Sequence, residues 1–279
     1  TPTTQDQREA FYQNLYSLLD STAYRTLAGI TSLQVLASAD AASLADQAKS
    51  DFGHFLAVHR LLPFALEGSS SAFAEAHADL YARWSADQAK RITGTGDLEF
   101  TDAYLADRAQ MLAFLMQANN NDTAAFASNQ VNDQVLYRDL GSLRAAANGQ
   151  VGPTEVNVFL TGGTSLPHGP NTRVIGFGTD AADTLKGRES DDRLYGGSGP
   201  DILAGSGGND RLEGGTGADT LNGGTGYDTY MADWGDTIVD AVQGDQSGVI
   251  YVGANSLQVA GGHRFEGEFA RGTGAGQVV

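Results

Sequence analysis

A nine-residue repeat over residues 178–231 constrains this chain more than any other feature. Six consecutive copies fit the pattern G-G-x-G-x-D-x-U-x, where U is a large apolar residue, although the first two copies lack most of the glycines. The sixth position is aspartate in every copy, namely Asp183, Asp192, Asp201, Asp210, Asp219 and Asp228. The eighth position is apolar in every copy, namely Leu185, Leu194, Leu203, Leu212, Leu221 and Tyr230. These few apolar residues cannot build a conventional hydrophobic core. Another interaction must therefore hold this segment folded.

The spacing predicts a coil with two copies per turn. The glycine-rich first six residues allow tight turns with positive φ, and the last three form a short strand whose apolar side chain faces inward. One coil then takes 18 residues, so Asp201 stacks on Asp183 and Asp219 on Asp201, while the other three aspartates form a second column. Carboxylates one strand spacing apart repel each other by roughly a few kcal/mol at an effective dielectric constant of about 20, and a divalent cation between them reverses the sign. Oxygen ligands in a flexible turn favour calcium over zinc or copper.

The repeat resembles the RTX (haemolysin-type) calcium-binding nonapeptide repeat, which folds as a parallel β-roll. The alternative is a Gly/Asp-rich flexible linker, which would not keep an apolar residue in phase through six copies. The resemblance implies that each ion is held by the aspartates of copies i and i+2 together with backbone carbonyls of the turns. The implied sites are Asp183/Asp201, Asp192/Asp210, Asp201/Asp219 and Asp210/Asp228, with Asp236 or Asp240 extending the series to about four or more calcium ions. The further ligands that it implies are Gly187, Glu189, Gly196, Gly197, Ser198, Gly199, Gly205, Ser206, Gly207, Gly208, Gly214, Gly215, Thr216, Gly217, Gly224 and Gly226.

The same resemblance implies a secreted bacterial protein. Such proteins leave through a type I channel, unfolded at low cytosolic calcium, and fold outside the cell. The net charge of −17 and the pI of about 4.4 suit cations and disfavour nucleic acid or anionic membranes as partners. Without cysteine the chain has no disulfide or thiolate metal site, and no apolar run reaches transmembrane length. We therefore expect calcium, a type I secretion apparatus and the rest of a larger parent protein as partners, because a start at Thr1 is typical of a processed or excised chain.

The first half of the chain is predicted to be helical. Residues Leu44, Ala48, Phe52, Phe55 and His59 follow one face of a helix, with spacings of 4, 4, 3 and 4. Further apolar stripes lie at 12–19, 73–84, 104–115 and, more weakly, 131–143. These stripes predict a bundle of about five or six helices.

We therefore expect an α+β multi-domain chain. Residues 1–147 form a helical bundle, 148–177 a linker with a short strand at 156–160, 178–231 the β-roll, and 232–279 a β cap and tail with strands at 249–252 and 257–260. The segments "DFGHFLAVHRLLPFALEG" and "DLYARWSADQAK" resemble the helical module that precedes the repeats in some very large RTX exoproteins, over residues 40–145.

Catalytic motifs are absent from the sequence. His54, His59 and His77 offer a conceivable zinc site, but no H-E-x-x-H motif is present, and core or surface roles are commoner for isolated histidines. No G-x-S-x-G motif stands at a strand-to-helix turn, and no phosphate-binding loop is present. We expect no catalytic residues and no organic cofactor. The leading hypothesis is a non-catalytic calcium-binding module, and the alternatives are a hydrolase, lipase-like or metal-dependent, with its site in the helical half and a partner-binding fragment of a toxin or adhesin.

Overall fold

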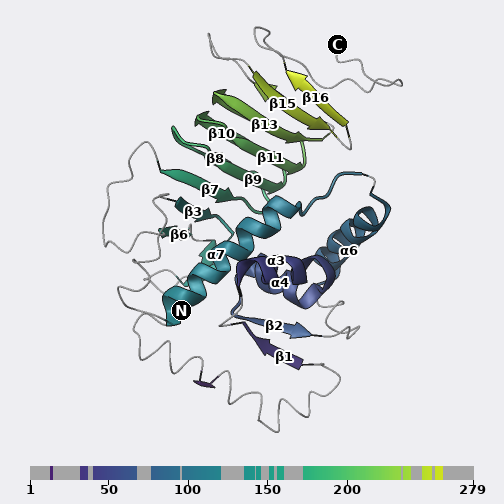
Figure 1. Cartoon of the computed structure of the whole chain (residues 1–279), viewed down its shortest axis with the longest axis vertical. Coiled ribbons are helices and arrows are strands. Elements are labelled where there is room, and N and C mark those ends of the chain that lie inside the picture. Colours follow the sequence, from purple (N-terminus) through teal and green to yellow (C-terminus); the bar gives the residue numbers. More distant parts are fainter. Residues whose placement is uncertain are drawn as a thin grey trace. The chain divides into compact units, whose positions relative to one another are not determined.

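The structure is a computed structural model, drawn in Figure 1. It describes residues 13–14, 32–36, 40–67, 77–94, 96–120, 135–141, 143–145, 151–153, 156–159, 172–233, 235–239, 247–252 and 255–259. The described residues fall into two compact units, one drawn from residues 1–94 and 100–130 and the other from residues 95–99 and 131–279.

The first unit is mainly helical. Its described helices are α3 (Ala41–Ser50), α4 (Phe52–Arg60), α6 (Ala78–Thr93) and α7 (Asp102–Asn120). Two short strands, β1 (Ser32–Val35) and β2 (Phe64–Glu67), pair antiparallel. The predicted stripes at 44–59 and 104–115 lie in helices. The apolar residues of the stripe at 12–19, and the part of the stripe at 73–84 before residue 77, lie outside the described residues.

The stripe at 44–59 is divided between two helices because Asp51 interrupts it. Asp51 has extended backbone (φ −127°, ψ 123°), so it ends α3 and begins α4. Its Oδ1 accepts a hydrogen bond from the His54 amide at 2.8 Å, as an N-cap does. Gly53 allows α4 to approach β2, because any side chain at this position would collide with the carbonyl oxygen of Leu66.

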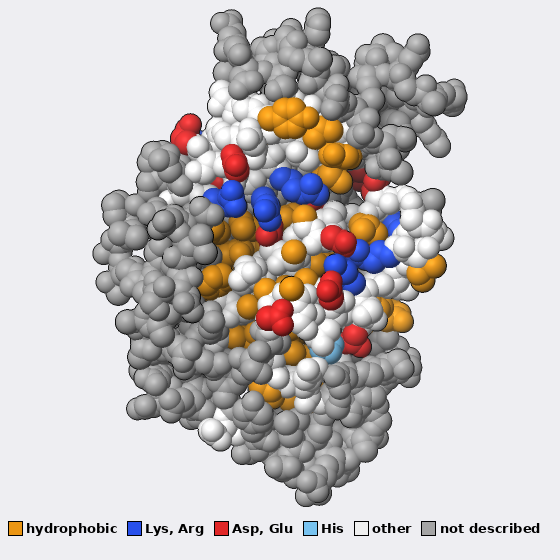
Figure 2. Space-filling view, in the orientation of Figure 1, with side chains coloured by type: hydrophobic (Ala, Val, Ile, Leu, Met, Phe, Trp, Pro, Cys, Tyr) orange, Lys and Arg blue, Asp and Glu red, His pale blue; other side chains and the backbone are white. Residues whose placement is uncertain are grey.

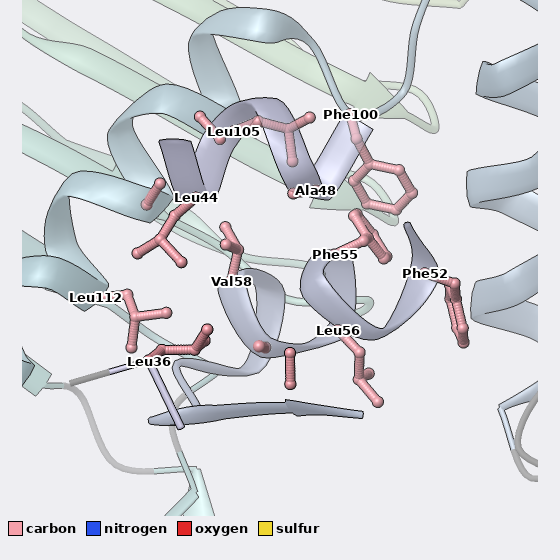
Figure 3. Close-up of a cluster of buried hydrophobic side chains, with 14 of the residues drawn as sticks. Leu36, Leu44, Ala48, Phe52, Phe55, Leu56, Val58, Phe100, Leu105 and Leu112 are labelled. Carbon is pink, nitrogen blue, oxygen red and sulfur yellow. The ribbon is translucent and has the colours of Figure 1, made fainter. Parts of the chain in front are cut away.

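The core of this unit is built from one face of each helix. Its buried residues include Leu44 and Ala48 of α3, Phe55 and Val58 of α4, and Leu105 of α7, each at most 1% exposed (Figure 3). The apolar periodicity of these helices therefore has its expected consequence, which is burial of one stripe per helix.

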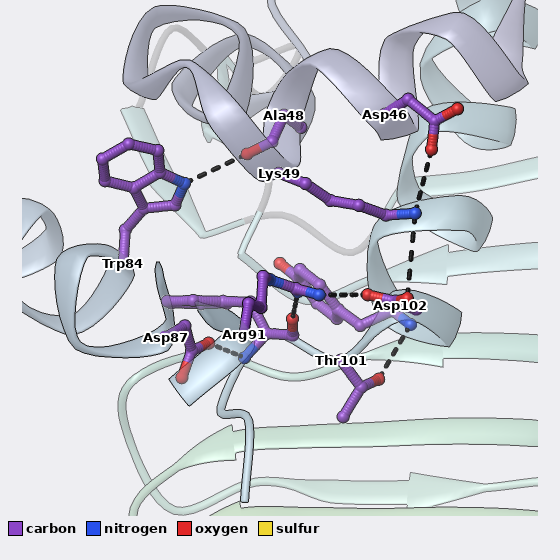
Figure 4. A network of polar contacts seen from close by, with 10 residues as sticks. Asp46, Ala48, Lys49, Trp84, Asp87, Arg91, Thr101 and Asp102 are labelled. Carbon is purple, nitrogen blue, oxygen red and sulfur yellow. Dashed lines mark hydrogen bonds and ion pairs between the residues drawn. The ribbon is translucent and has the colours of Figure 1, made fainter. Parts of the chain in front are cut away.

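Polar contacts join the helices at the edge of this core (Figure 4). Trp84 Nε1 of α6 donates to the carbonyl of Ala48 in α3 at 3.0 Å. The buried carboxylate of Asp87 accepts the amide of Phe100 at 2.7 Å, and Arg91 pairs with Asp102 at the start of α7. The first contact joins α6 to α3, and the other two join α6 to the start of α7.

The second unit contains the β-roll, whose strands form two sheets (Figure 1) that are parallel throughout the repeat, with an antiparallel strand at each end of the larger one. One sheet has the order β14-β12-β10-β8, with β8 (Thr184–Lys186), β10 (Ile202–Gly207), β12 (Thr220–Thr225) and β14 (Thr237–Val239). The other has the order β16-β15-β13-β11-β9-β7-β3-β6. Its strands are β3 (Val135–Asp139), β6 (Val156–Phe159), β7 (Arg173–Phe177), β9 (Arg193–Ser198), β11 (Arg211–Thr216), β13 (Tyr227–Ala232), β15 (Ser247–Val252) and β16 (Asn255–Val259).

The register confirms a coil of 18 residues. In one sheet Leu203 pairs with both Leu185 and Leu221, and in the other Leu212 pairs with both Leu194 and Tyr230. The six apolar residues of the repeat are all fully buried between the two sheets. A parallel β-solenoid of about four turns therefore follows the helices, and the predicted α+β architecture with a β-roll is confirmed.

One helical prediction is wrong. The stripe at 131–143 belongs partly to strand β3, which pairs parallel to β7 and antiparallel to β6. The strands expected at 156–160, 249–252 and 257–260 correspond to β6, β15 and β16. Strands β4 (Leu143–Ala145) and β5 (Val151–Pro153) pair antiparallel across the predicted boundary at 147, with β5 in the expected linker. The exact domain boundaries remain a prediction.

Candidate metal sites

The aspartates of the repeat stack in two columns, as the spacing predicts. Each backbone amide donates to Oδ1 of the aspartate one coil further on. The pairs are Asp183 to Asp201 (2.8 Å), Asp192 to Asp210 (2.7 Å), Asp201 to Asp219 (2.8 Å), Asp210 to Asp228 (2.9 Å) and Asp219 to Asp236 (2.9 Å). One oxygen of each carboxylate in this series is thus used to join consecutive coils. Asp236 belongs to the series although it lies 17 residues after Asp219.

The second carboxylate oxygen has no protein donor at three of these positions. In the described part of the chain, Oδ2 of Asp201, Asp210 and Asp219 is buried without a hydrogen-bond partner, and each residue is 1% exposed. Burial, with a smaller contribution from neighbouring carboxylates, raises the pKa of Asp201 to about 7 and that of Asp210 to about 8. Burial also raises the pKa of Asp219. A buried anion of this kind is costly unless a cation or a proton compensates it.

Backbone oxygens converge on the same places. A methyl group added to Gly196 would collide with the carbonyl oxygen of Gly214 and with Oδ2 of Asp201. The same change at Gly205 would bring it against the carbonyl oxygen of Gly223 and Oδ2 of Asp210. Glycine at the first repeat position therefore leaves room where a carboxylate oxygen and a carbonyl oxygen of the next coil face each other.

This donor set fits calcium. Among the described residues, no three His, Cys, Asp or Glu side chains form a metal-binding group. The oxygens that meet at the first repeat position are those of a carboxylate and of a backbone carbonyl. Calcium accepts such oxygen-only sets, with six to eight ligands in irregular geometry. Positive φ at the second and fourth repeat positions turns the backbone of the loops, as at Gly197 (φ 105°) and Gly199 (φ 100°).

The residues implied as turn ligands all lie in the described repeat segment, and their role as ligands stays a prediction. The described loops include all sixteen of them, and positive φ occurs at Gly197, Gly199, Ser206, Gly208, Gly215, Gly217, Gly224 and Gly226. The carbonyl oxygen of Thr216 accepts a hydrogen bond from the Gly199 amide at 2.8 Å, so one of its lone pairs is used within the roll. Glu189 Oε2 lies beside Gly207 of the next coil. Asp240 lies outside the described residues.

Sequence reasoning missed Asp233. Its Oδ1 is buried without a partner among the described residues. Burial, and after it the nearby carboxylate of Asp219, raises the pKa of Asp233 to about 6. Asp233 also donates its amide to Oδ2 of Asp236 at 2.8 Å. Its signal in the sequence was its place three residues before Asp236, in the turn that continues the first column.

The histidines considered for zinc have separate partners. His54 Nδ1 contacts Asp51 Oδ1 at 2.7 Å, and its Nε2 contacts Gln34 Oε1 at 2.8 Å, so both ring nitrogens are engaged. His59 Nδ1 contacts the Tyr104 hydroxyl at 2.8 Å, and its ring stacks on Phe55. These contacts pin β1 to α4 and α4 to α7, and the ring nitrogens of His54 do not point to a shared metal.

Most of the repeat aspartates contribute little to the surface of the described roll. Figure 2 shows a face on which acidic side chains are scattered singly among basic and apolar ones. The repeat aspartates from Asp192 to Asp236 are each at most 1% exposed, so their charge lies within the turns. In the described residues no helix is long and apolar enough to cross a membrane.

Comparison with known proteins identifies the repeat region. The family model of the RTX calcium-binding nonapeptide repeat (4 copies) matches residues 177–212, 195–230 and 204–239. No curated protein and no solved structure gave a match. RTX repeats bind calcium in general and are typical of secreted bacterial proteins. The register, the aspartate columns and the family match agree, and residues 177–239 of this chain are an RTX calcium-binding repeat region.

Proposed function

We propose that the roll binds calcium ions between stacked loops of the same column and that its folding depends on them. The observation that supports this most strongly is the set of buried, unpartnered Oδ2 atoms of Asp201, Asp210 and Asp219. An ion beside each of them would neutralise a buried carboxylate and connect two coils. Because these sites need both coils in register, the binding free energy becomes folding free energy of the roll.

We further propose that the chain is a non-catalytic module of a larger secreted protein that leaves the cell through a type I channel. RTX repeats are typical of secreted bacterial proteins. The net charge of −17 also favours an unfolded chain at low calcium, because each bound ion removes two negative charges from self-repulsion. Midpoints of about 10⁻⁴ to 10⁻³ M calcium, the range of extracellular calcium modules, would keep the roll unfolded before export.

The test is circular dichroism of the full chain in chelator, in millimolar magnesium and in millimolar calcium. We expect the β signal of the roll to appear only with calcium, while the helical signal of the first unit is present in all three solutions. Magnesium is the matched control, because it has the same charge but requires a smaller and more regular ligand shell. A β signal that is unchanged in chelator would contradict the proposal.

A further inference from the structure

The loops of the roll are of two kinds, which differ in how they treat the carboxylate. In the loops that end at Asp201, Asp210 and Asp219, the second and fourth residues have positive φ and Oδ2 of the aspartate has no protein donor. We call these open loops. In the first loop of each column, which end at Asp183 and Asp192, none of the corresponding residues has positive φ. We call these closed loops.

A closed loop satisfies its own carboxylate. The amide of Thr179 donates to Oδ2 of Asp183 at 2.6 Å, and the Thr179 hydroxyl donates to the same atom at 2.7 Å. The amide of Arg188 donates to Oδ2 of Asp192 at 2.5 Å. In both loops the donor is the second residue of the repeat, and the acceptor is the atom that an open loop leaves without a donor.

The difference corresponds to the orientation of one peptide group. Rotating the peptide plane between the first and second loop residues by about 180° changes φ of the second residue from negative to positive, as in the relation between type I and type II turns. The rotation turns the N–H of the second residue away from the carboxylate of its loop. Glycine adopts the positive φ at no steric cost, whereas the β-branched Thr179 and the long Arg188 do not. The residue at the second position therefore decides whether Oδ2 of the carboxylate has a hydrogen-bond donor in its own loop.

We infer that the first loop of each column holds its aspartate by backbone amides and takes no ion with it, so that the ladder of calcium ions begins at Asp201 and Asp210. This inference rests on the proposed calcium binding and reduces the number of loops that take part in it. In the implied sites Asp183/Asp201 and Asp192/Asp210, the carbonyl oxygen of the next coil is present, but Oδ2 of the first aspartate already accepts an N–H of its own loop, on the side that an ion would need. The amides close these coils without metal and give the next coil a fixed edge on which to form.

The experiment counts the calcium ions bound per full-length chain by isothermal titration calorimetry and by metal analysis after dialysis. Asp183→Asn keeps an acceptor oxygen for Thr179, so we expect the wild-type number of ions. Asp201→Asn is the matched change in an open loop, and we expect one ion fewer. Loss of an ion in Asp183→Asn would overturn the inference.

Two loop-opening variants test the inference by the gain of a calcium ion. A gain cannot be explained by loss of folding, so the result does not depend on a destabilised protein. Thr179→Gly with Ala181→Gly, and Arg188→Gly with Ser190→Gly, place glycine at the second and fourth positions of the closed loops. We expect each pair to add one ion to the wild-type number. An unchanged number in both variants would overturn the inference while leaving calcium binding intact. A wild-type chain that binds no calcium would instead contradict the proposed function from which the inference starts.

Discussion

Ser206 carries backbone strain at the point where the loops are most constrained. It occupies the second position of an open loop with φ of 91°, and within the described roll it is the only residue other than glycine with positive φ. A side chain in this region costs about 1–2 kcal/mol. The loop that ends at Asp210 has the same backbone conformation as the loops with glycine at the second position, Gly197 and Gly215, and Ser206 must therefore adopt positive φ.

We predict that Ser206→Gly stabilises the calcium-bound roll by about 0.5–1 kcal/mol. The gain is the released strain less the larger conformational entropy of glycine in the unfolded chain, which is about 0.5–1 kcal/mol. Urea unfolding at saturating calcium measures it. Ser198→Gly is the control, since φ of Ser198 is not positive and we expect this change to be neutral or destabilising. Equal effects of the two substitutions would show that strain at Ser206 is not the cause.

At the scale of the strand, one buried residue per repeat supplies the apolar cohesion of the roll. Leu203 is 0% exposed and lies between Leu185 and Leu221, whereas its neighbour Ile202 points outward and is 51% exposed. The two side chains therefore offer a matched comparison on one strand, β10.

We predict that Leu203→Ala destabilises the roll by about 2–5 kcal/mol, because it leaves a cavity in the apolar layer between the sheets. Ile202→Ala should change stability by less than about 0.5 kcal/mol, as surface substitutions usually do. The calcium concentration at the midpoint of roll folding measures both effects, and it should rise sharply for Leu203→Ala alone. A similar rise for both variants would mean that the inner layer does not carry the stability.

The elements that the sequence predicts well are those with a local cause. The register of the roll follows from a strict nine-residue period, and the aspartate columns follow from the register. Strand β3 was missed because apolar spacing at Val135, Leu136 and Leu140 fits a helix as well as a strand, and its pairing with β6 and β7 is non-local. The break between α3 and α4 was missed because the apolar stripe continues through it, although Asp51 is a residue that favours an N-cap.

The unpartnered oxygens could be predicted only in part. The sequence places an aspartate in every turn, but the second residue of the loop decides which carboxylate finds an amide. Thr179 and Arg188 were visible as departures from the motif, yet their hydrogen bonds to Asp183 and Asp192 depend on a peptide orientation that periodicity does not report. Asp233 required the geometry of the turn before Asp236.

On the scale of the whole molecule, the two units should respond to acid in opposite directions when calcium is absent. In the helical unit, burial lowers the pKa of His59 well below 6.5, and nearby arginines lower it further. The unfolded chain then binds the proton more readily, so stability is complete above pH 6.5 and is lost as pH falls towards the lowered pKa. The slope approaches about 1.4 kcal/mol per pH unit where only the unfolded form is protonated.

In the roll the sign is reversed. Burial raises the pKa of Asp201 to about 7 and that of Asp210 to about 8, above the value of 3.8 for an unfolded aspartate. The folded roll then binds the protons more readily, so stability is present at pH values below 3.8 and is lost as pH rises through about 7–8.

We predict that acidification from pH 8 to pH 5 in chelator increases the β signal of the roll and lowers the urea midpoint of the helical signal. His59→Gln should remove the second effect without changing the first. A roll that becomes less ordered on acidification would contradict the raised pKa values, and a flat helical midpoint in the wild type would contradict the lowered one.

The coil of 18 residues also limits how such a protein can change in length during evolution. Loss or duplication of two adjacent copies shifts every later strand by one full winding and returns each side chain to its former face. Loss of a single copy moves every downstream strand to the opposite sheet. Leu212, for example, would then lie in the sheet that now contains Leu203. Insertions and deletions in this gene segment should therefore be tolerated in even numbers of copies and selected against in odd ones.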